Sequence, residues 1–215
     1  SSFGLYTWMN NPESQMVAVT VRAGSKAEMA LPDGTFVHLN AATNLEYDVN
    51  NSKQRLVKLS GEAFFDVAKN PDCPFKVIIN DLQIEVVGTS FNVKTYKKDI
   101  VETSLLSGRI RISGGSLPHE YTLSPGQKAT YSAMDRTLRI SKADAHVEAG
   151  WRDNYLIFES TPLIDVIAQI ERWYGVEIRL HHKQIAQDLL SGSFRNESIQ
   201  NVIRSLSIQY GFKYE

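Results

Sequence analysis

Cysteine, long apolar runs and net charge are nearly absent from the sequence, and each absence excludes a class of protein. Cys73 is the single cysteine among 215 residues, so no intrachain disulfide can form and the redox compartment stays open. The formal net charge of −1 lacks the basic excess that nucleic-acid binding normally shows. No apolar run reaches the roughly 18 residues of a membrane helix, and residues 1–15 lack a signal-peptide pattern. We therefore expect a cytosolic protein, or a piece whose targeting or anchoring segment has been removed.

Motifs for catalysis, cofactors and metals are also missing. The sequence holds no phosphate loop, no dinucleotide fingerprint and no zinc-ligand spacing. His181 and His182 come nearest to a metal pair, but adjacent side chains on a strand point to opposite faces and cannot chelate together. Cys73 lies in a turn with no histidine nearby in a catalytic motif, and no serine lies in the sequence pattern of a nucleophile elbow. We predict a non-enzymatic protein with no metal or cofactor site.

The sequence does contain one unit written twice, within residues 151–215. Nine apolar or glycine positions recur 36 residues further on: Phe158, Leu163, Val166, Ile167, Ile170, Tyr174, Gly175, Val176 and Ile178 correspond to Phe194, Ile199, Val202, Ile203, Leu206, Tyr210, Gly211, Phe212 and Tyr214. The apolar spacing i, i+3, i+4, i+7 predicts one amphipathic helix in each copy. A unit of this size leaves no room for a deep active site.

Local signals predict the ends of both helices. Ser160 and Asn196 stand at N-cap positions, and Pro162 suits a first helical turn, where its missing N–H is not needed. Gly175 and Gly211 follow the helices, where a left-handed C-terminal cap needs no Cβ.

Extended segments are predicted on both sides of each helix. They are Tyr155–Phe158 and Leu190–Phe194 before the helices, and Val176–Leu180 and Phe212–Tyr214 after them. The C-terminal part is therefore predicted to be a βαβ-βαβ unit, with two helices covering one face of a small sheet.

Residues 16–143 are almost purely β. Alternating segments are separated by glycine-bearing turns: Val17–Val21, Phe36–Leu39, Leu56–Leu59, Ala63–Val67, Phe75–Ile79, Ile84–Val87, Phe91–Val93, Val101–Leu106, Ile110–Ile112, Ala129–Tyr131 and Leu138–Ile140. Such strands make a sandwich, a barrel or a β-solenoid-like stack, and the sequence does not choose among these. The predicted fold class is mostly β plus α+β: an all-β multi-strand domain, then the small duplicated domain.

Six short sequence motifs, called phrases below, follow one another along the β region. They are Leu31–Thr35 leading to Leu39–Asn40, Leu59–Val67, Pro74–Val77, Val87–Val93, Leu106–Ile110 and Leu123–Gln127. Their order and spacing resemble the extracytoplasmic sensor domain of FecR-type transmembrane anti-sigma factors. The duplicated unit is similar to the short N-terminal (STN) domain of secretins and TonB-dependent receptors, which that family often carries at its C-terminal end. Physically, the phrases are typical of turns and scaffold rather than of a reaction centre.

This resemblance implies a place and partners for the protein. The chain would be the periplasmic part of a single-span inner-membrane protein, attached to the membrane only through a helix absent from the sequence. It would receive a signal from the N-terminal domain of an outer-membrane TonB-dependent transporter. An absent cytoplasmic segment would hold an ECF sigma factor.

A domain division follows from the resemblance and from a change in composition near Asp144–Gly150, where Ala, Asp, His and Glu replace the alternating pattern. We predict a linker in residues 1–15 after a removed membrane span, a FecR-like all-β domain in residues 16–148, and an STN-like domain in residues 149–215. Trp151 follows the boundary, and its size predicts that it packs at the junction.

Gly88 and Thr89 carry the one chemical hypothesis. A threonine hydroxyl aligned with the preceding glycine carbonyl can attack it and move the acyl group from N to O, after which hydrolysis of the ester cuts the chain. Some members of the resembled family are believed to self-cleave at such a pair. The alternative is a plain turn or bulge.

The final strand is the candidate docking site. Phe212, Lys213, Tyr214 and Glu215 form a predicted edge strand whose unpaired backbone groups suit strand addition by a partner.

Two other classes of function stay open. Three tryptophans and nine tyrosines permit an extracytoplasmic carbohydrate-binding β-module, although the spacing reveals no aromatic platform. A hydrolase would need a carboxylate pair such as Glu62 and Asp66, whose Cα atoms would lie roughly 13 Å apart on one strand, which is wide for a glycosidase. The two carboxylates share a strand face, which we expect to be solvated rather than catalytic.

Overall fold

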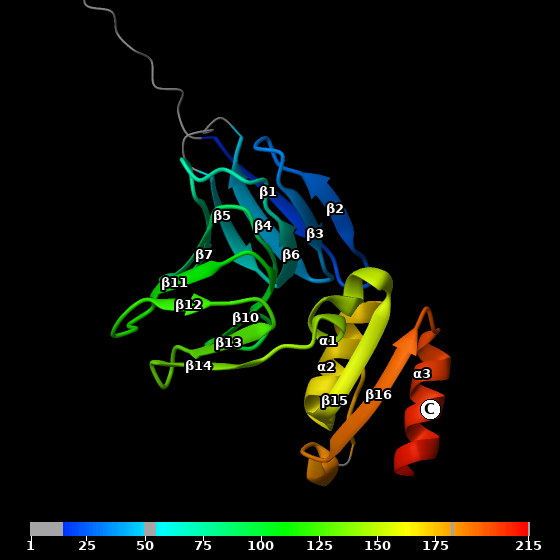
Figure 1. The fold of residues 1–215 in the computed structure, drawn as a ribbon. Coiled ribbons are helices and arrows are strands. Elements are labelled where there is room, and N and C mark those ends of the chain that lie inside the picture. Colours follow the sequence, from blue (N-terminus) through cyan, green and yellow to red (C-terminus); the bar gives the residue numbers. More distant parts are fainter. Residues whose placement is uncertain (1–14, 50–54, 182, 215) are drawn as a thin grey trace, which may run out of the picture.

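The computed structural model describes residues 15–49, 55–181 and 183–214. Within these ranges the strands form two seven-stranded sheets and one two-stranded sheet. Figure 1 shows the two large sheets packed together as a sandwich, with the remaining elements at one end of it. No helix in the described ranges is long and apolar enough to cross a bilayer.

In each of the two large sheets, the strands lie side by side in the order in which they follow along the chain. The first consists of β1 (Met16–Val21), β4 (Thr43–Asp48), β5 (Arg55–Ser60), β7 (Phe75–Ile79), β8 (Leu82–Val86), β11 (Ile110–Gly114) and β12 (Tyr121–Leu123). The second consists of β2 (Ala27–Ala30), β3 (Phe36–Leu39), β6 (Glu62–Asp66), β9 (Ser90–Lys94), β10 (Ile100–Ser107), β13 (Gln127–Ser132) and β14 (Thr137–Lys142). Neighbouring strands are antiparallel except for the parallel pair β5 and β7.

This order resolves the choice that the sequence left open. The strand numbers rise steadily across both sheets, because the chain alternates between the sheets and adds strands in one direction. The protein therefore has the two layers of a sandwich and the stepwise winding of a solenoid. It is not a barrel, since each sheet ends in two edge strands.

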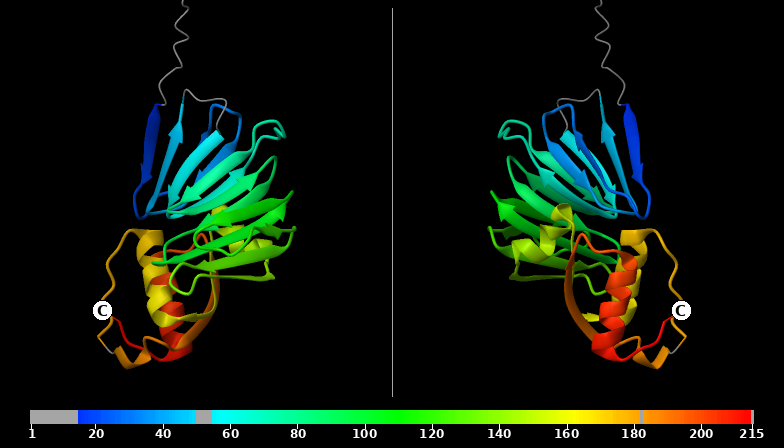
Figure 2. Two further views of the ribbon diagram at one scale, coloured as in Figure 1. Left: turned by 90° about the vertical axis from the view of Figure 1, so that its left-hand side faces the viewer. Right: turned by 90° about the vertical axis from the view of Figure 1, so that its right-hand side faces the viewer.

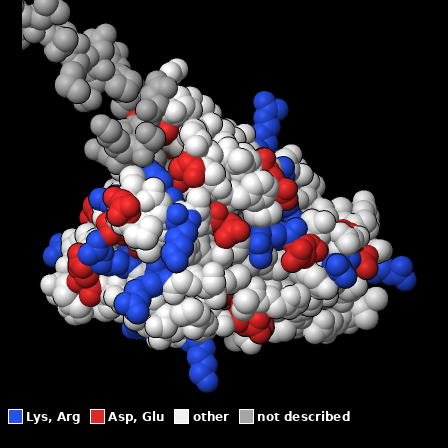
Figure 3. Space-filling view, turned by 45° about the horizontal axis from the view of Figure 1, so that its top comes forward, with Lys and Arg blue, Asp and Glu red and all other residues white. Residues whose placement is uncertain are grey.

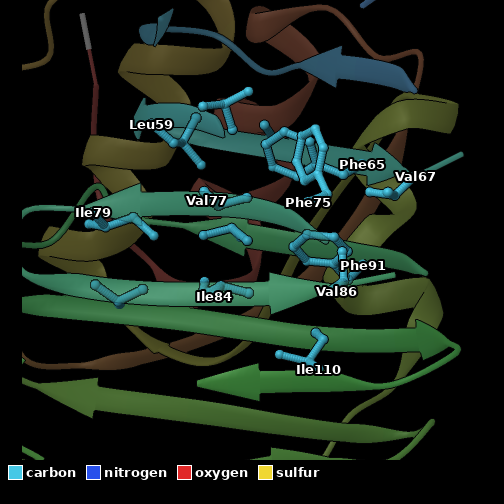
Figure 4. Close-up of a cluster of buried hydrophobic side chains, with 14 of the residues drawn as sticks. Leu59, Phe65, Val67, Phe75, Val77, Ile79, Ile84, Val86, Phe91 and Ile110 are labelled. Carbon is cyan, nitrogen blue, oxygen red and sulfur yellow. The ribbon is translucent and has the colours of Figure 1, made fainter. Parts of the chain in front are cut away.

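The core between the sheets follows from alternation. In β7 the side chains of Phe75, Val77 and Ile79 are buried while those between them are half-buried, and β8 repeats the pattern with Ile84 and Val86. Figure 4 shows these side chains pointing into the same layer. Three short or polar strands escaped the sequence prediction (β2, β4 and β12), because their alternation is too brief or too rich in Thr, Asn and Glu to stand out.

A short bridging segment joins the sandwich to the C-terminal unit. It contains α1 (Ala145–Ala149) and the 3-10 turn η1 (Gly150–Asp153), neither of which the sequence predicted. The C-terminal unit then consists of β15 (Tyr155–Pro162), α2 (Leu163–Tyr174), the 3-10 turn η2 (Lys183–Ile185), β16 (Leu189–Arg195) and α3 (Ile199–Tyr210). Both views of Figure 2 place this unit at one end of the sandwich.

The duplication is confirmed in the helices and their C-terminal caps. Helices α2 and α3 have equal lengths and begin 36 residues apart, and Gly175 and Gly211 both adopt the left-handed conformation. The N-cap prediction was wrong. Pro162 and Ser198 occupy those positions, whereas Ser160 and Asn196 lie two residues earlier with positive φ.

The strands predicted after each helix do not form. Residues 176–180 and 211–214 belong to no strand, and β15 pairs antiparallel with β16 alone among the described elements. Their alternation has a different cause, because Ile178, Leu180 and Phe212 pack against the apolar core of the unit. The described unit is thus βα-βα rather than βαβ-βαβ.

We predict that the turn glycines differ sharply in their tolerance of a side chain. Gly61 has φ of +113°, and a Cβ there would lie 2.5 Å from Thr43 Oγ1 and 2.7 Å from Thr43 Cα. Gly126 has φ of +80°, but a Cβ would meet nothing within 4 Å. Gly126→Ala should cost about 1–2 kcal/mol of unfolding free energy, and Gly61→Ala at least about 3 kcal/mol. Urea denaturation measures both, and equal losses would contradict the prediction.

Candidate functional site

The bridging segment lies across the outer face of the second sheet. Trp151 is only 6% exposed and packs against Phe64, Leu106, Ala149 and Trp173. These neighbours come from the sandwich, from α1 and from α2, so the indole joins three parts of the chain, as its size predicted.

A buried carboxylate lies beneath this segment. Glu62 on β6 is 6% exposed, and its oxygens accept hydrogen bonds from Asn40 Nδ2 at 2.7 Å and Asn92 Nδ2 at 2.9 Å. Asn92 Oδ1 in turn accepts a hydrogen bond from Trp151 Nε1 at 3.1 Å. The three polar side chains and the indole therefore form one continuous network.

The prediction that Glu62 and Asp66 lie on a solvated strand face was therefore wrong for Glu62. The bridging segment covers that half of the strand face, while Asp66 at the end of β6 stays exposed and accepts a hydrogen bond from the Ser90 hydroxyl. The two carboxylates have separate partners and do not form a pair open to a substrate. Sequence reasoning missed Asn40 and Asn92, although three of the six phrases end on or contain the members of this network.

Helix α2 is held by two loops of the sandwich. The loop after β9 provides Lys97, whose ammonium lies 2.6 Å from Asp165, and Tyr96, whose ring lies 4.1 Å below the Arg172 guanidinium. The turn between β1 and β2 provides the Gly24 N–H, which donates to the Arg172 carbonyl at 2.8 Å. The helix is thus fixed to the sandwich at both ends.

Lys26 of the same turn reaches the bridging segment. Its ammonium donates to the Trp151 carbonyl at 2.6 Å and to Asn154 Oδ1 at 3.0 Å, and it stands 3.7 Å over the Trp173 ring. Burial lowers the pKa of Lys26 to about 8, against the opposing attraction of Glu62. The ammonium therefore makes favourable contacts at a cost in hydration.

Gly88 and Thr89 lie in a tightly packed corner. Thr89 is buried, and its hydroxyl donates to the Arg109 carbonyl at 3.1 Å. A Cβ on Gly108 would lie 2.7 Å from that hydroxyl and 2.8 Å from the Gly88 carbonyl oxygen, while a Cβ on Gly88 would lie 2.9 Å from Lys69 Cα. Both glycines are required for the close approach of these backbones.

The predicted docking tail is partly anchored. Phe212 packs into the core of the C-terminal unit, whereas Lys213 and Tyr214 are exposed. Glu215 lies outside the described residues. A cavity of about 310 Å³ opens elsewhere on this unit, between Trp173 and Phe194.

The other residues considered for chemistry are not brought together. No group of three metal-ligating side chains exists among the described residues. His181 is exposed, His182 lies outside the described residues, and Cys73 is half-buried in a loop before β7. On the face seen in Figure 3, acidic and basic side chains are interspersed without a large area of one charge.

Comparison with known proteins gives a consistent result over nearly the whole chain. Residues 17–111 match the family model described as FecR protein, and residues 155–215 match the model described as FecR, C-terminal. Two crystal structures of candidate anti-sigma factors from Parabacteroides distasonis ATCC 8503 are similar at 30% identity, with TM-scores of 0.85 and 0.84. The likeness covers 94% and 93% of this chain and 94% of each of those chains. No curated protein matches the sequence.

We predict that the buried carboxylate contributes to stability and its exposed neighbour does not. In Glu62→Gln, an amide nitrogen replaces one accepting oxygen, so Asn40 or Asn92 loses its acceptor in a buried site. The loss should be about 1–3 kcal/mol of unfolding free energy. Asp66→Asn, the matched change on the same strand, should stay within about 0.5 kcal/mol. Chemical denaturation of both variants measures this, and a silent Glu62→Gln would show that the network is not stabilising.

Proposed function

Because the chain belongs to the FecR family, we propose that it is the periplasmic signal-relay part of an anti-sigma factor that spans the inner membrane once. Its C-terminal unit receives a signal from the N-terminal domain of an outer-membrane TonB-dependent transporter. Sequence beyond the chain described above carries the membrane span and a cytoplasmic segment that binds an ECF sigma factor. The observation that carries the proposal is the likeness to candidate anti-sigma factors across both parts of the chain at once.

The internal geometry agrees with binding and relay rather than turnover. The buried side chains of Glu62, Asn40 and Asn92 are hydrogen-bonded to one another and closed to solvent. A carbohydrate-binding β-module, the alternative, would need an exposed aromatic platform. Phe65, Phe75 and Phe91 of the sandwich are buried in its core, and the exposed ring of Phe36 packs edge-on against His38. We therefore favour a protein partner.

The tail that begins at Phe212 is the proposed docking element. Its first residue is anchored in the core, and the backbone beyond it is exposed, so a partner strand can pair with it without unfolding the unit. The anchored phenylalanine also limits the conformational entropy that the tail loses on binding.

A pull-down tests this docking element. The bait is the purified signalling domain of a TonB-dependent transporter, chosen by a reading frame beside that of this protein if the genome has one there. Lys213→Pro removes one backbone N–H and should lower capture at least tenfold, whereas Lys213→Ala removes only the side chain and should leave capture unchanged. Undiminished capture by Lys213→Pro would exclude the tail backbone from docking. Absence of any sigma factor or transporter gene nearby would count against the whole function.

A second part of the proposal is self-cleavage between Gly88 and Thr89. The threonine oxygen attacks the Gly88 carbonyl carbon, the C–N bond breaks, and the hydroxyl proton passes to the freed amine. Water then hydrolyses the ester, which restores the hydroxyl and leaves a carboxylate on Gly88. Burial of the hydroxyl and its contact with the Arg109 carbonyl hold it in one place beside this bond.

Intact mass spectrometry tests the cleavage. Protein purified without proteases should yield two fragments divided after residue 88, and Thr89→Ala should remain whole. Thr89→Ser keeps a hydroxyl and should still be cut. If the wild-type protein keeps only its uncut mass after prolonged incubation, the pair is a structural corner and nothing more.

A further inference from the structure

The turn of residues 22–26 joins two edge strands of the sandwich, one from each of the large sheets. Strand β1 is an edge of the first sheet and pairs with β4, while β2 is an edge of the second sheet and pairs with β3. Each has one pairing neighbour among the described strands. In β1 only Val21 is fully buried. Strands with one neighbour and little burial open before the rest of a sheet does.

The same turn makes close backbone contact with the end of α2. A Cβ on Gly24, which has φ of +78°, would lie 3.2 Å from the Tyr174 carbonyl oxygen and 3.3 Å from Gly175 Cα. A Cβ on Gly175 would lie 3.1 Å from the Ala23 carbonyl oxygen. Two glycines thus face each other across the contact, and the Gly24 N–H satisfies the Arg172 carbonyl, one of the helix-end acceptors.

Lys26 adds a second attachment a few residues on. It holds the bridging segment through the Trp151 carbonyl and Asn154, and α2 through the Trp173 ring. Burial lowers the pKa of Lys26, so lost hydration partly offsets these contacts.

We propose that the turn of residues 22–26 is the relay between the two parts: a shift of α2 releases Gly24 and Lys26, and β1 loosens from β4 in response. This mechanism rests on the proposed function, because it assumes that a partner docks on the C-terminal unit and moves α2. Strand β1 is the first described strand in chain order and an edge of the first sheet, so its loosening would carry the signal to the N-terminal end of the sandwich.

Hydrogen exchange of the isolated protein tests the relay without any partner. Lys26→Met keeps an unbranched apolar side chain but removes the ammonium that lies over Trp173, and it should speed the exchange of the hydrogen-bonded amides of β1 at least tenfold. Exchange in β13 and β14, at the other end of the sandwich, should not change. Lys58→Met is the matched control, because Lys58 lies on β5 of the first sheet and forms an ion pair with Glu46 on the neighbouring strand β4.

A glycine pair tests the contact from its other side. Gly24→Ala pushes the turn away from α2 and should speed exchange in both β1 and the last turn of the helix, since coupling is reciprocal. Gly34→Ala carries a similar backbone penalty at φ of +84° with its nearest neighbour 3.8 Å away, and should act only locally. Unchanged β1 exchange in both Lys26→Met and Gly24→Ala would overturn the relay, even if the transporter domain binds. Loosened β1 in a protein that captures no transporter domain would support the relay while removing the proposed function.

Discussion

The carboxylate of Glu62 loses its contact with water when the bridging segment closes over it, and the arrangement of the two parts depends on how that loss is compensated. A buried charge costs several kcal/mol unless donors replace its hydration. The amides of Asn40 and Asn92 supply those donors, and Asn92 passes the connection on to the Trp151 indole. Lys26 and Arg172 add positive charge that interacts with Glu62. Polar networks of this kind favour one geometry, because a shift would leave several groups unsatisfied together.

Apolar packing alone would not position the C-terminal unit so closely. The sandwich and the unit have separate cores, and the small cluster of Phe64, Ala149 and Trp151 is the apolar contact between them. Most of the remaining attachments are ion pairs, helix-end hydrogen bonds and cations over aromatic rings, such as Arg152 over Phe64 at 3.6 Å. Such contacts depend on direction and are individually modest. A junction built in this way is defined in geometry yet modest in strength, as a signalling protein requires.

The sequence predicted the elements whose signal is local and repeated. In strands such as β7 and β8, buried and half-buried residues alternate regularly, and the two helices have the same apolar spacing. Both kinds of element were therefore predicted from the sequence. The fold class is confirmed, while the layering of the sheets needed the structure, because alternation shows that a face is buried but not what buries it. The same limit explains Glu62, where a polar residue at an alternating position is typical of an exposed face. Its burial depends on a segment more than eighty residues away, which no local pattern reports.

The steady rise of strand numbers across both sheets has a consequence for how such a molecule can vary and assemble. Most strands pair with strands that lie a short distance away along the chain, so the sandwich can fold from one end by adding neighbouring strands in turn. A pair of strands could be gained or lost at a hairpin without a change in how the other strands are connected, since each strand pairs chiefly with its direct neighbours in the sheet. The architecture therefore allows the reach of the molecule to be adjusted in steps, while the shape of its two ends is kept.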